Sequence, residues 1–240
     1  MKKVTAFVFG FNHYATEIID NISHEYDDIH MFCLDKKETQ NQKYNIQSFD
    51  LSDEWNEVET LISATANSIA FCVLEDNAQN IFLTISLRAS FKDLVIVSLA
   101  TDKESANKLS IAGANKVIPI VKTTADIIAN MINRPIATKV LHNILYEKSD
   151  LKIAQILVQN AEKFDGKFPA DIDWSRYRGI IVLSIVHEDL SKEFIYSSQA
   201  KHKALVNGDS LVVTGYEEDI LEFEKLIGRR YYVNWGNWSW

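Results

Sequence analysis

The first 120 residues alternate short apolar runs with segments of helical periodicity, and this alternation restricts the possible folds more than any other feature. Most runs are nearly continuous in apolar residues, which is typical of parallel strands covered on both faces. Six strands are expected: Val4–Phe9, Ile29–Leu34, Tyr44–Asp50, Ser68–Leu74, Leu94–Leu99 and Val117–Ile120. Together with five helical patterns, they predict an α/β fold, a doubly wound, Rossmann-like parallel sheet with strand order 3-2-1-4-5-6.

The first strand runs directly into Gly10, and a helical pattern with Ile18 and Ile22 on its buried face begins a few residues later. Such a turn directs the N–H groups of a helix N-terminus beyond the sheet, where an anion such as a nucleotide phosphate is stabilised. Asp35 closes the second strand about twenty residues further on, the position of a ribose-binding acid. We therefore expect a ligand crevice at the carboxyl ends of strands 1 and 4.

Charge and hydropathy exclude several classes of protein. The net charge is −8 and no block of Lys or Arg exceeds two residues, so nucleic acid is not an expected partner. No apolar run reaches the roughly 18 residues of a membrane-spanning helix. The run after the two N-terminal lysines is also too short for a signal peptide. We expect a cytoplasmic chain.

The two cysteines are expected to be reduced. Cys33 and Cys72 fall in strands 2 and 4, with strand 1 between them, which separates them by roughly 9.5 Å. A disulfide requires Cα atoms within about 7 Å. Because no CxxC motif and no pair of histidines at helical spacing occurs, no metal site is expected either.

Two helical patterns follow the sixth strand and exceed what one sheet needs. The first opens at Thr124 and is expected to turn Ile127, Ile128 and Met131 inward, and Pro135 separates it from the second. The surplus apolar surface predicts an arm that packs on a second copy of the chain or back onto its own domain.

From about Lys148 the pattern changes to short β segments and one helix, Glu217–Ile227, which predicts a small α+β domain. The expected strands are Leu151–Val158, Gly179–Val186, Glu193–Tyr196 and Ser210–Thr214. We divide the chain into a Rossmann-like domain (1–134), a crossover helix or dimerisation arm (135–148), an α+β domain (149–228) and an aromatic tail (229–240). The tail predicts a contact surface for a protein or the membrane interface, or a segment folded over its own domain.

An ordered set of motifs resembles one protein family. The set comprises VFGFNHYA around Gly10, the acidic end of strand 2 at Asp35, FDLSD at 49–53, SANKLSIAGANKVI at 105–118 and NGDSLVVTG at 207–215. In this order they resemble the RCK family, the regulator-of-potassium-conductance domains of potassium channels and of the peripheral subunits of Trk and Ktr uptake systems. The resemblance covers residues 4 to about 227.

This resemblance implies regulation without catalysis. The N-terminal domain would bind NAD(H) or an adenine nucleotide, and domains would assemble as a homodimer or a higher ring. The ring would gate a potassium channel or transporter, with the chain in the cytoplasm or at the inner face of the membrane. Residues expected to contact the nucleotide are Gly10, Phe11, Asn12, His13, Tyr14, Asp35, Lys36, Asp50, Leu51, Leu74 and Glu75.

The chain departs from the family pattern for dinucleotides in two places, the glycine turn and the end of strand 5. Asn12 stands where GxGxxG has its second glycine, so it either donates its amide to a phosphate or is a turn residue of a site that no longer binds. Ser98, Leu99 and Ala100 end strand 5 where the family often has a phosphate-facing arginine. A mononucleotide, or no ligand, fits these residues at least as well as NAD.

Other acidic and basic groups near the turn have ordinary explanations. His13 in the first helical turn would oppose the helix dipole if charged, which favours a neutral hydrogen-bonding or packing residue. Glu75 and Asp76 would repel a polyphosphate, which favours a solvated strand end. The rival functions are an NAD-dependent oxidoreductase and a scaffold of this fold that has lost its ligand.

Overall fold

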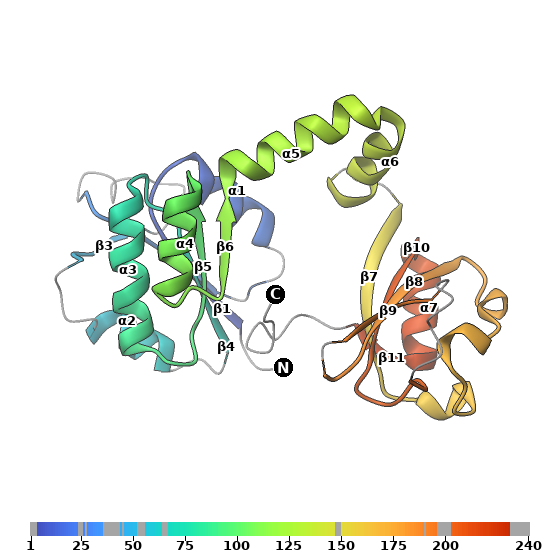
Figure 1. Ribbon diagram of the computed structural model, residues 1–240. Coiled ribbons are helices and arrows are strands. Elements are labelled where there is room, and N and C mark those ends of the chain that lie inside the picture. Colours follow the sequence, from blue (N-terminus) through green and yellow to red (C-terminus); the bar gives the residue numbers. More distant parts are fainter. Residues whose placement is uncertain are drawn as a thin grey trace. The chain divides into compact units, whose positions relative to one another are not determined.

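A computed structural model describes residues 4–23, 26, 28–35, 44, 46–51, 56–63, 67–146, 150–189, 191–195 and 203–230 (Figure 1). The described residues divide into two compact units, one that extends to Ala129 and one that begins at Asn130. Each unit has its own sheet and its own core, so each is described by itself.

Unit 1 is a six-stranded parallel sheet with the order β3-β2-β1-β4-β5-β6, which confirms the predicted topology. Its strands are β1 (Val4–Phe9), β2 (Asp28–Cys33), β3 (Ile46–Ser48), β4 (Asn67–Cys72), β5 (Val95–Ala100) and β6 (Lys116–Pro119). β1 is central and pairs with β2 on one side and β4 on the other. The buried thiols of Cys33 and Cys72 lie on those two flanking strands and form no disulfide.

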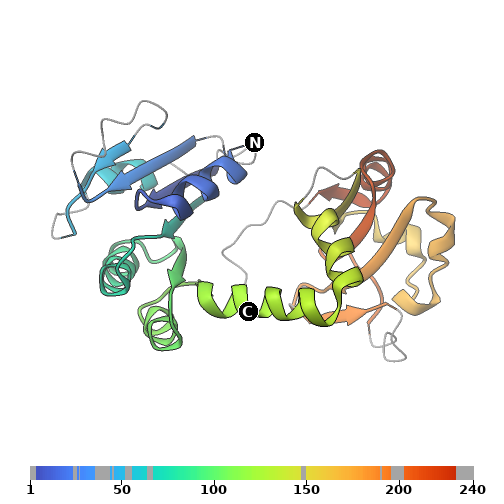
Figure 2. The ribbon, with the colours of Figure 1, turned by 90° about the horizontal axis from the view of Figure 1, so that it is seen from above.

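Helices cover both faces of this sheet: α1 (His13–Ile22), α2 (Asn56–Ser63), α3 (Asn77–Ser90) and α4 (Lys103–Ile111). α3 and α4 lie side by side (Figure 2). Alternate residues of β1 face opposite layers. Phe9 stacks on Phe32 with ring centroids 4.9 Å apart and shares a core with Leu83 of α3. Val8 instead packs with Ala15 of α1.

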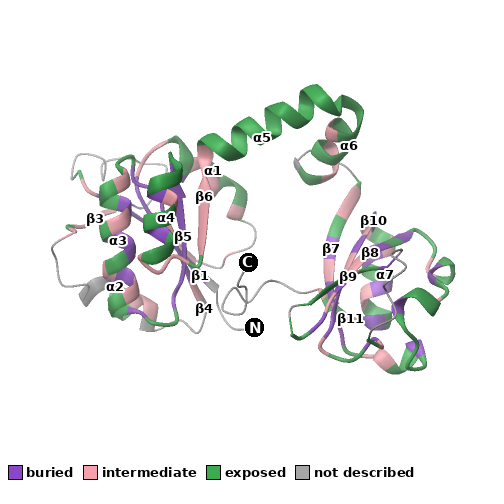
Figure 3. Cartoon of the chain, viewed as in Figure 1, coloured by how far each residue is buried: buried purple, intermediate pink, exposed green. Residues whose placement is uncertain are grey.

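The helix after β6 begins earlier than the sequence predicted. α5 spans Ile120–Asn133 and follows Pro119 directly, and α6 spans Pro135–Tyr146, with Pro135 at its first position as expected. The expectation that Ile127, Ile128 and Met131 turn inward is wrong, because these side chains are 44%, 52% and 44% exposed. Figure 3 shows α5 exposed along its length.

Unit 2 is a five-stranded antiparallel sheet with the order β11-β7-β10-β8-β9. Its strands are β7 (Leu151–Val158), β8 (Ile180–Val186), β9 (Lys192–Phe194), β10 (Ser210–Tyr216) and β11 (Gly228–Arg230). The helix α7 (Glu217–Ile227) begins and ends where the sequence predicted and inserts Ile220, Phe223 and Ile227 into the core. The predicted α+β fold is therefore confirmed.

Four short elements of unit 2 were not predicted. Three are 3₁₀ turns, Ala161–Phe164, Pro169–Asp171 and Trp174–Arg176, and the fourth is β11. Single turns and three-residue strands carry no periodicity, so only tertiary packing selects them.

Among the residues that the structure describes, none of the helices combines the length and apolar character that a membrane crossing requires.

Candidate functional site

The predicted ligand residues gather at one edge of the unit 1 sheet. Gly10 follows β1, Asp35 follows β2, Asp50 follows β3 and Leu74 follows β4. Since these strands are parallel and adjacent, their carboxyl ends lie at the same edge. Of the eleven residues named from the sequence, Lys36 lies outside the described residues. We call this edge the nucleotide edge.

The turn at Gly10 admits no side chain. Gly10 has φ +132°, and a Cβ there would lie 2.7 Å from the carbonyl oxygen of Val73. Its N–H donates to the carbonyl of Phe32 at 2.7 Å. The ends of β1, β2 and β4 thus meet at this residue, and glycine is required for their close approach.

Asn12 is a helix cap that also joins two strand ends. Its side-chain oxygen accepts from the N–H of Ala15 at 3.0 Å, and its Nδ2 donates to the carbonyl of Val73 at 2.6 Å. Both halves of the amide are therefore engaged within the fold. A phosphate could take this amide only by displacing the Val73 carbonyl, which favours the structural interpretation of Asn12.

The side chains at the nucleotide edge differ in exposure. Leu74 is buried, whereas Phe11 and Leu51 are half-buried and join the cores beneath the edge. The remaining described candidates are Asn12, which is half-buried, and His13, Tyr14, Asp35, Asp50 and Glu75, which are exposed. The nucleotide edge therefore combines buried and half-buried apolar side chains with exposed carboxylates.

Asn80 is a residue of this edge that sequence reasoning missed. It is 2% exposed in α3, and its amide accepts from Leu74 N–H at 2.9 Å and donates to Leu74 C=O at 2.7 Å. An asparagine within the apolar pattern of a helix was the available signal. It fixes the backbone at the end of β4 opposite the glycine turn.

The end of β5 carries neutral polar groups where the family often has an arginine. Ser98 is buried and forms a hydrogen bond with Thr84. Their hydroxyl oxygens are 3.0 Å apart, and either hydroxyl can be the donor. Burial raises the pKa of the neighbouring Cys72 thiol to about 12, although hydrogen bonds to Ser98 and Thr84 partly offset this effect. This thiol is therefore a core group rather than a nucleophile.

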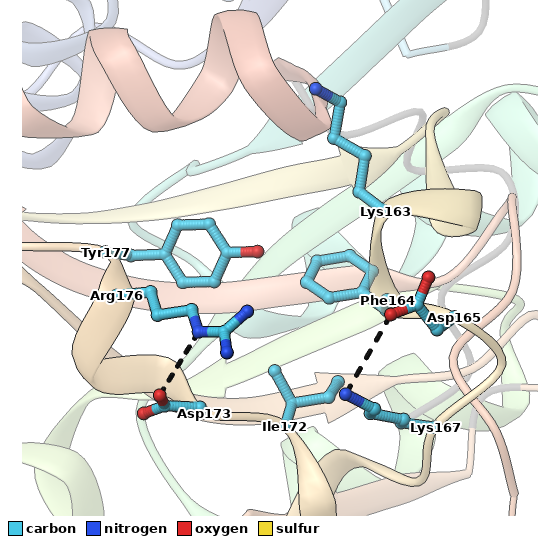
Figure 4. Close-up of a pocket in the computed structure, with 8 residues that line it drawn as sticks. All are labelled: Lys163, Phe164, Asp165, Lys167, Ile172, Asp173, Arg176 and Tyr177. Carbon is cyan, nitrogen blue, oxygen red and sulfur yellow. Dashed lines mark hydrogen bonds and ion pairs between the residues drawn. The ribbon is translucent and has the colours of Figure 1, made fainter.

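A small cavity lies in unit 2, within the segment of 3₁₀ turns (Figure 4). Its volume is about 40 Å³, enough for water molecules but far below a nucleotide. Two of its cations are paired with acids, Arg176 with Asp173 at 3.2 Å and Lys167 with Asp165 at 3.9 Å. The nucleotide edge remains the stronger candidate.

Within the described part of the chain, no group of three His, Cys, Asp or Glu side chains is arranged to hold a metal ion.

Comparison with known proteins agrees with this geometry. Residues 6–120 match the family model of the TrkA-N domain. A probable potassium channel protein 2 of Methanocaldococcus jannaschii is 26% identical over 163 residues, covering 65% of this chain and 46% of that protein. Potassium channel protein 1 of the same organism is 22% identical and is covered to 45% of its length. The chain spans about half the length of these curated relatives.

Solved structures share the fold at low sequence identity. The human SLO3 gating ring aligns with a TM-score of 0.65 at 12% identity, covering 92% of this chain and 46% of that one. The GsuK channel aligns with a TM-score of 0.50 at 17% identity, covering 94% of this chain and 38% of that one. Both alignments extend over the two units of this chain.

Proposed function

We propose that this chain, whose residues 6–120 match the TrkA-N domain and whose motifs resemble the RCK family, is a regulatory, non-catalytic part of a potassium channel or transporter. It would act on the cytoplasmic side of the membrane, sensing a small ligand and passing the signal to a potassium-conducting partner. The observation that carries this proposal is the match of residues 6–120, on the unit that holds the nucleotide edge.

The proposed ligand is an adenine nucleotide or NAD(H) at the nucleotide edge. The first turn of α1 supplies backbone N–H groups for a phosphate. Asp35, at the end of β2, is suited to a ribose hydroxyl, and Asp50 is a second acid near the adenosine. The engaged amide of Asn12 and the neutral end of β5 favour a ligand with few phosphates.

A homodimer is the proposed minimal assembly, formed through α5 and α6. These helices expose a set of large apolar side chains that is unusual for a monomer. The set comprises Val121, Ile127, Ile128, Met131, Ile132, Ile136, Val140, Leu141 and Leu145. Burial of this surface against a second copy would remove it from water, and further copies could extend the dimer into a ring.

A thermal-shift series with NAD, NADH, ATP, ADP and AMP tests the ligand. A ligand at a thousandfold its dissociation constant should stabilise the folded state by about 4 kcal/mol. Asp35→Ala should abolish the shift for ribose-containing ligands. Asp93→Ala, an exposed acid at the opposite edge of the same sheet, should leave it intact.

Two outcomes would redirect the assignment. Steady oxidation of NADH in the presence of carbonyl compounds would indicate an oxidoreductase and contradict the regulatory function. No shift with any nucleotide, together with an intact dimer, would favour a scaffold that has lost its ligand.

A further inference from the structure

The outer edge of β7 in the unit 2 sheet is only partly paired with β11. β7 has eight residues, whereas β11 has three and pairs with Ile156–Val158 (Figure 1). Among the described residues, no strand pairs with the earlier part of β7 on this side. α6 contacts β7, yet the side chain of Ile153 remains 38% exposed. A sheet edge of this kind can pair with a further strand.

Backbone hydrogen-bonding groups of β7 face this edge. The N–H of Val158 donates at 2.8 Å to the carbonyl of Asp209, which precedes β10, so Val158 bonds toward β10. Because the direction of bonding alternates along an antiparallel strand, Ile153 and Gln155 direct their N–H and C=O groups the opposite way. These groups therefore point to the side on which β11 lies.

The register of β11 directs the chain that follows it along the same edge. The rest of the aromatic tail, residues 231–240, lies outside the described residues. β11 is antiparallel to β7, with Arg230 opposite Ile156. Continued by three residues, this register would set Val233 opposite Ile153.

The composition of the next five residues, YYVNW at 231–235, suits an edge strand. Tyr, Val and Trp favour strands, the tail contains no proline, and Gly236 follows this segment. The segment has the same number of residues as the part of β7 that precedes its pairing with β11. Its length and composition therefore match the available edge.

The position of Arg230 shows which face each tail residue would take. Its guanidinium pairs with Glu217 at 2.8 Å and with Glu224 at 3.4 Å, both on α7, so Arg230 lies on the α7 face of the sheet. Side chains alternate along a strand. Tyr231 and Val233 would therefore lie on the outer face, away from α7.

The outer face carries apolar side chains that these residues would join. Ile153, Thr214 and Ile181 are aligned across β7, β10 and β8. Ile153 is 38% exposed and Ile181 is 55% exposed. Val233, set beside Ile153, would extend this row, and cross-strand pairs of β-branched residues stabilise a sheet.

We propose that the edge of β7 is a docking site for residues 231–235 of the same chain, which extend β11 as an antiparallel strand. Tyr231 and Val233 cover the outer face beside Ile153. The segment is already attached in register, so it docks without the loss of translational freedom that a second copy or a separate peptide would suffer. Once docked, it closes the edge to strands of other chains.

Amide hydrogen exchange measured by NMR tests the docking, with the full chain compared with a variant that stops after Arg230. The amides of Ile153 and Gln155 should exchange about tenfold or more faster in the shortened chain. The amides of Ala154 and Ile156 face β10 and should exchange equally slowly in both chains, which shows that the sheet stays folded. Equal exchange of Ile153 and Gln155 in the two chains would overturn the proposal.

A pair of cysteines tests the register and the identity of the occupant. Ile153→Cys with Val233→Cys should form a disulfide within one chain, because opposite residues lie about 5.5 Å apart between Cα atoms, within reach of a disulfide. Ile153→Cys with Asn234→Cys is the matched control and should cross-link several-fold less, since Asn234 would face α7. Peptide mapping by mass spectrometry identifies the bonds. Equal cross-linking of the two pairs, or a disulfide between two chains, would contradict this site.

Discussion

At the scale of single residues, the nucleotide edge depends on two positions that hold three strand ends together. Gly10 admits the Val73 carbonyl where any side chain would clash, and Asn12 donates to the same carbonyl while capping α1. The Val73 carbonyl thus lies close to Gly10 and accepts a hydrogen bond from Asn12. A ligand bound here would contact a backbone whose geometry is set before it arrives.

Gly10→Ala should destabilise unit 1 by about 3 kcal/mol or more, because it adds backbone strain and a contact at 2.7 Å with Val73. Gly166→Ala is the matched control. Gly166 also has positive φ, +66°, but a Cβ there meets nothing within 4 Å, so the cost should stay near 1 kcal/mol. Denaturant unfolding measures both, and equal losses would contradict the role of the close approach.

At the scale of elements, α5 and α6 differ from the other helices. α1, α3, α4 and α7 each bury at least two residues, whereas α5 buries none. Its apolar periodicity is as strong as theirs, yet its large apolar side chains are exposed. The proposed homodimer accounts for this surface.

The double substitution Ile128→Asp and Val140→Asp should convert the dimer to a monomer, because a charge on each helix would have to be buried in the interface. Light scattering coupled to size exclusion gives the mass. Ile111→Asp on α4 is the control, since Ile111 is 88% exposed and lies outside these two helices. A wild-type chain that is monomeric at all concentrations would refute the interface.

At the scale of the whole molecule, the chain consists of two units, each with a core of its own. Unit 1 holds the nucleotide edge. In an assembly, a ligand bound at this edge acts only by the difference in affinity that it has between alternative arrangements.

Leu211→Ala should lower the stability of unit 2 by about 2–5 kcal/mol, because Leu211 is fully buried in the core of that unit. The nucleotide-dependent shift of unit 1 should persist in this variant. Differential scanning calorimetry with and without nucleotide measures both effects. If nucleotide no longer stabilised unit 1 in this variant, unfolding of unit 1 and its binding of nucleotide would depend on unit 2.

The sequence by itself determined the architecture of unit 1 and the α+β class of unit 2. Apolar runs joined by short connections have few topologies available, so the strand order 3-2-1-4-5-6 and the common edge for Gly10, Asp35, Asp50 and Leu74 followed from local patterns. The bounds of β7 and α7 were also predicted, because each has a clear period and a clear end.

Only the tertiary structure decided how individual polar groups are used. Asn12 and Val73 are 61 positions apart, so no local pattern could show that the amide is engaged. The exposure of α5 depends on what surrounds it rather than on its own periodicity. His187 likewise lies near Glu193 and Asp209, at 3.8 Å and 3.1 Å, only because β8 pairs with both β9 and β10.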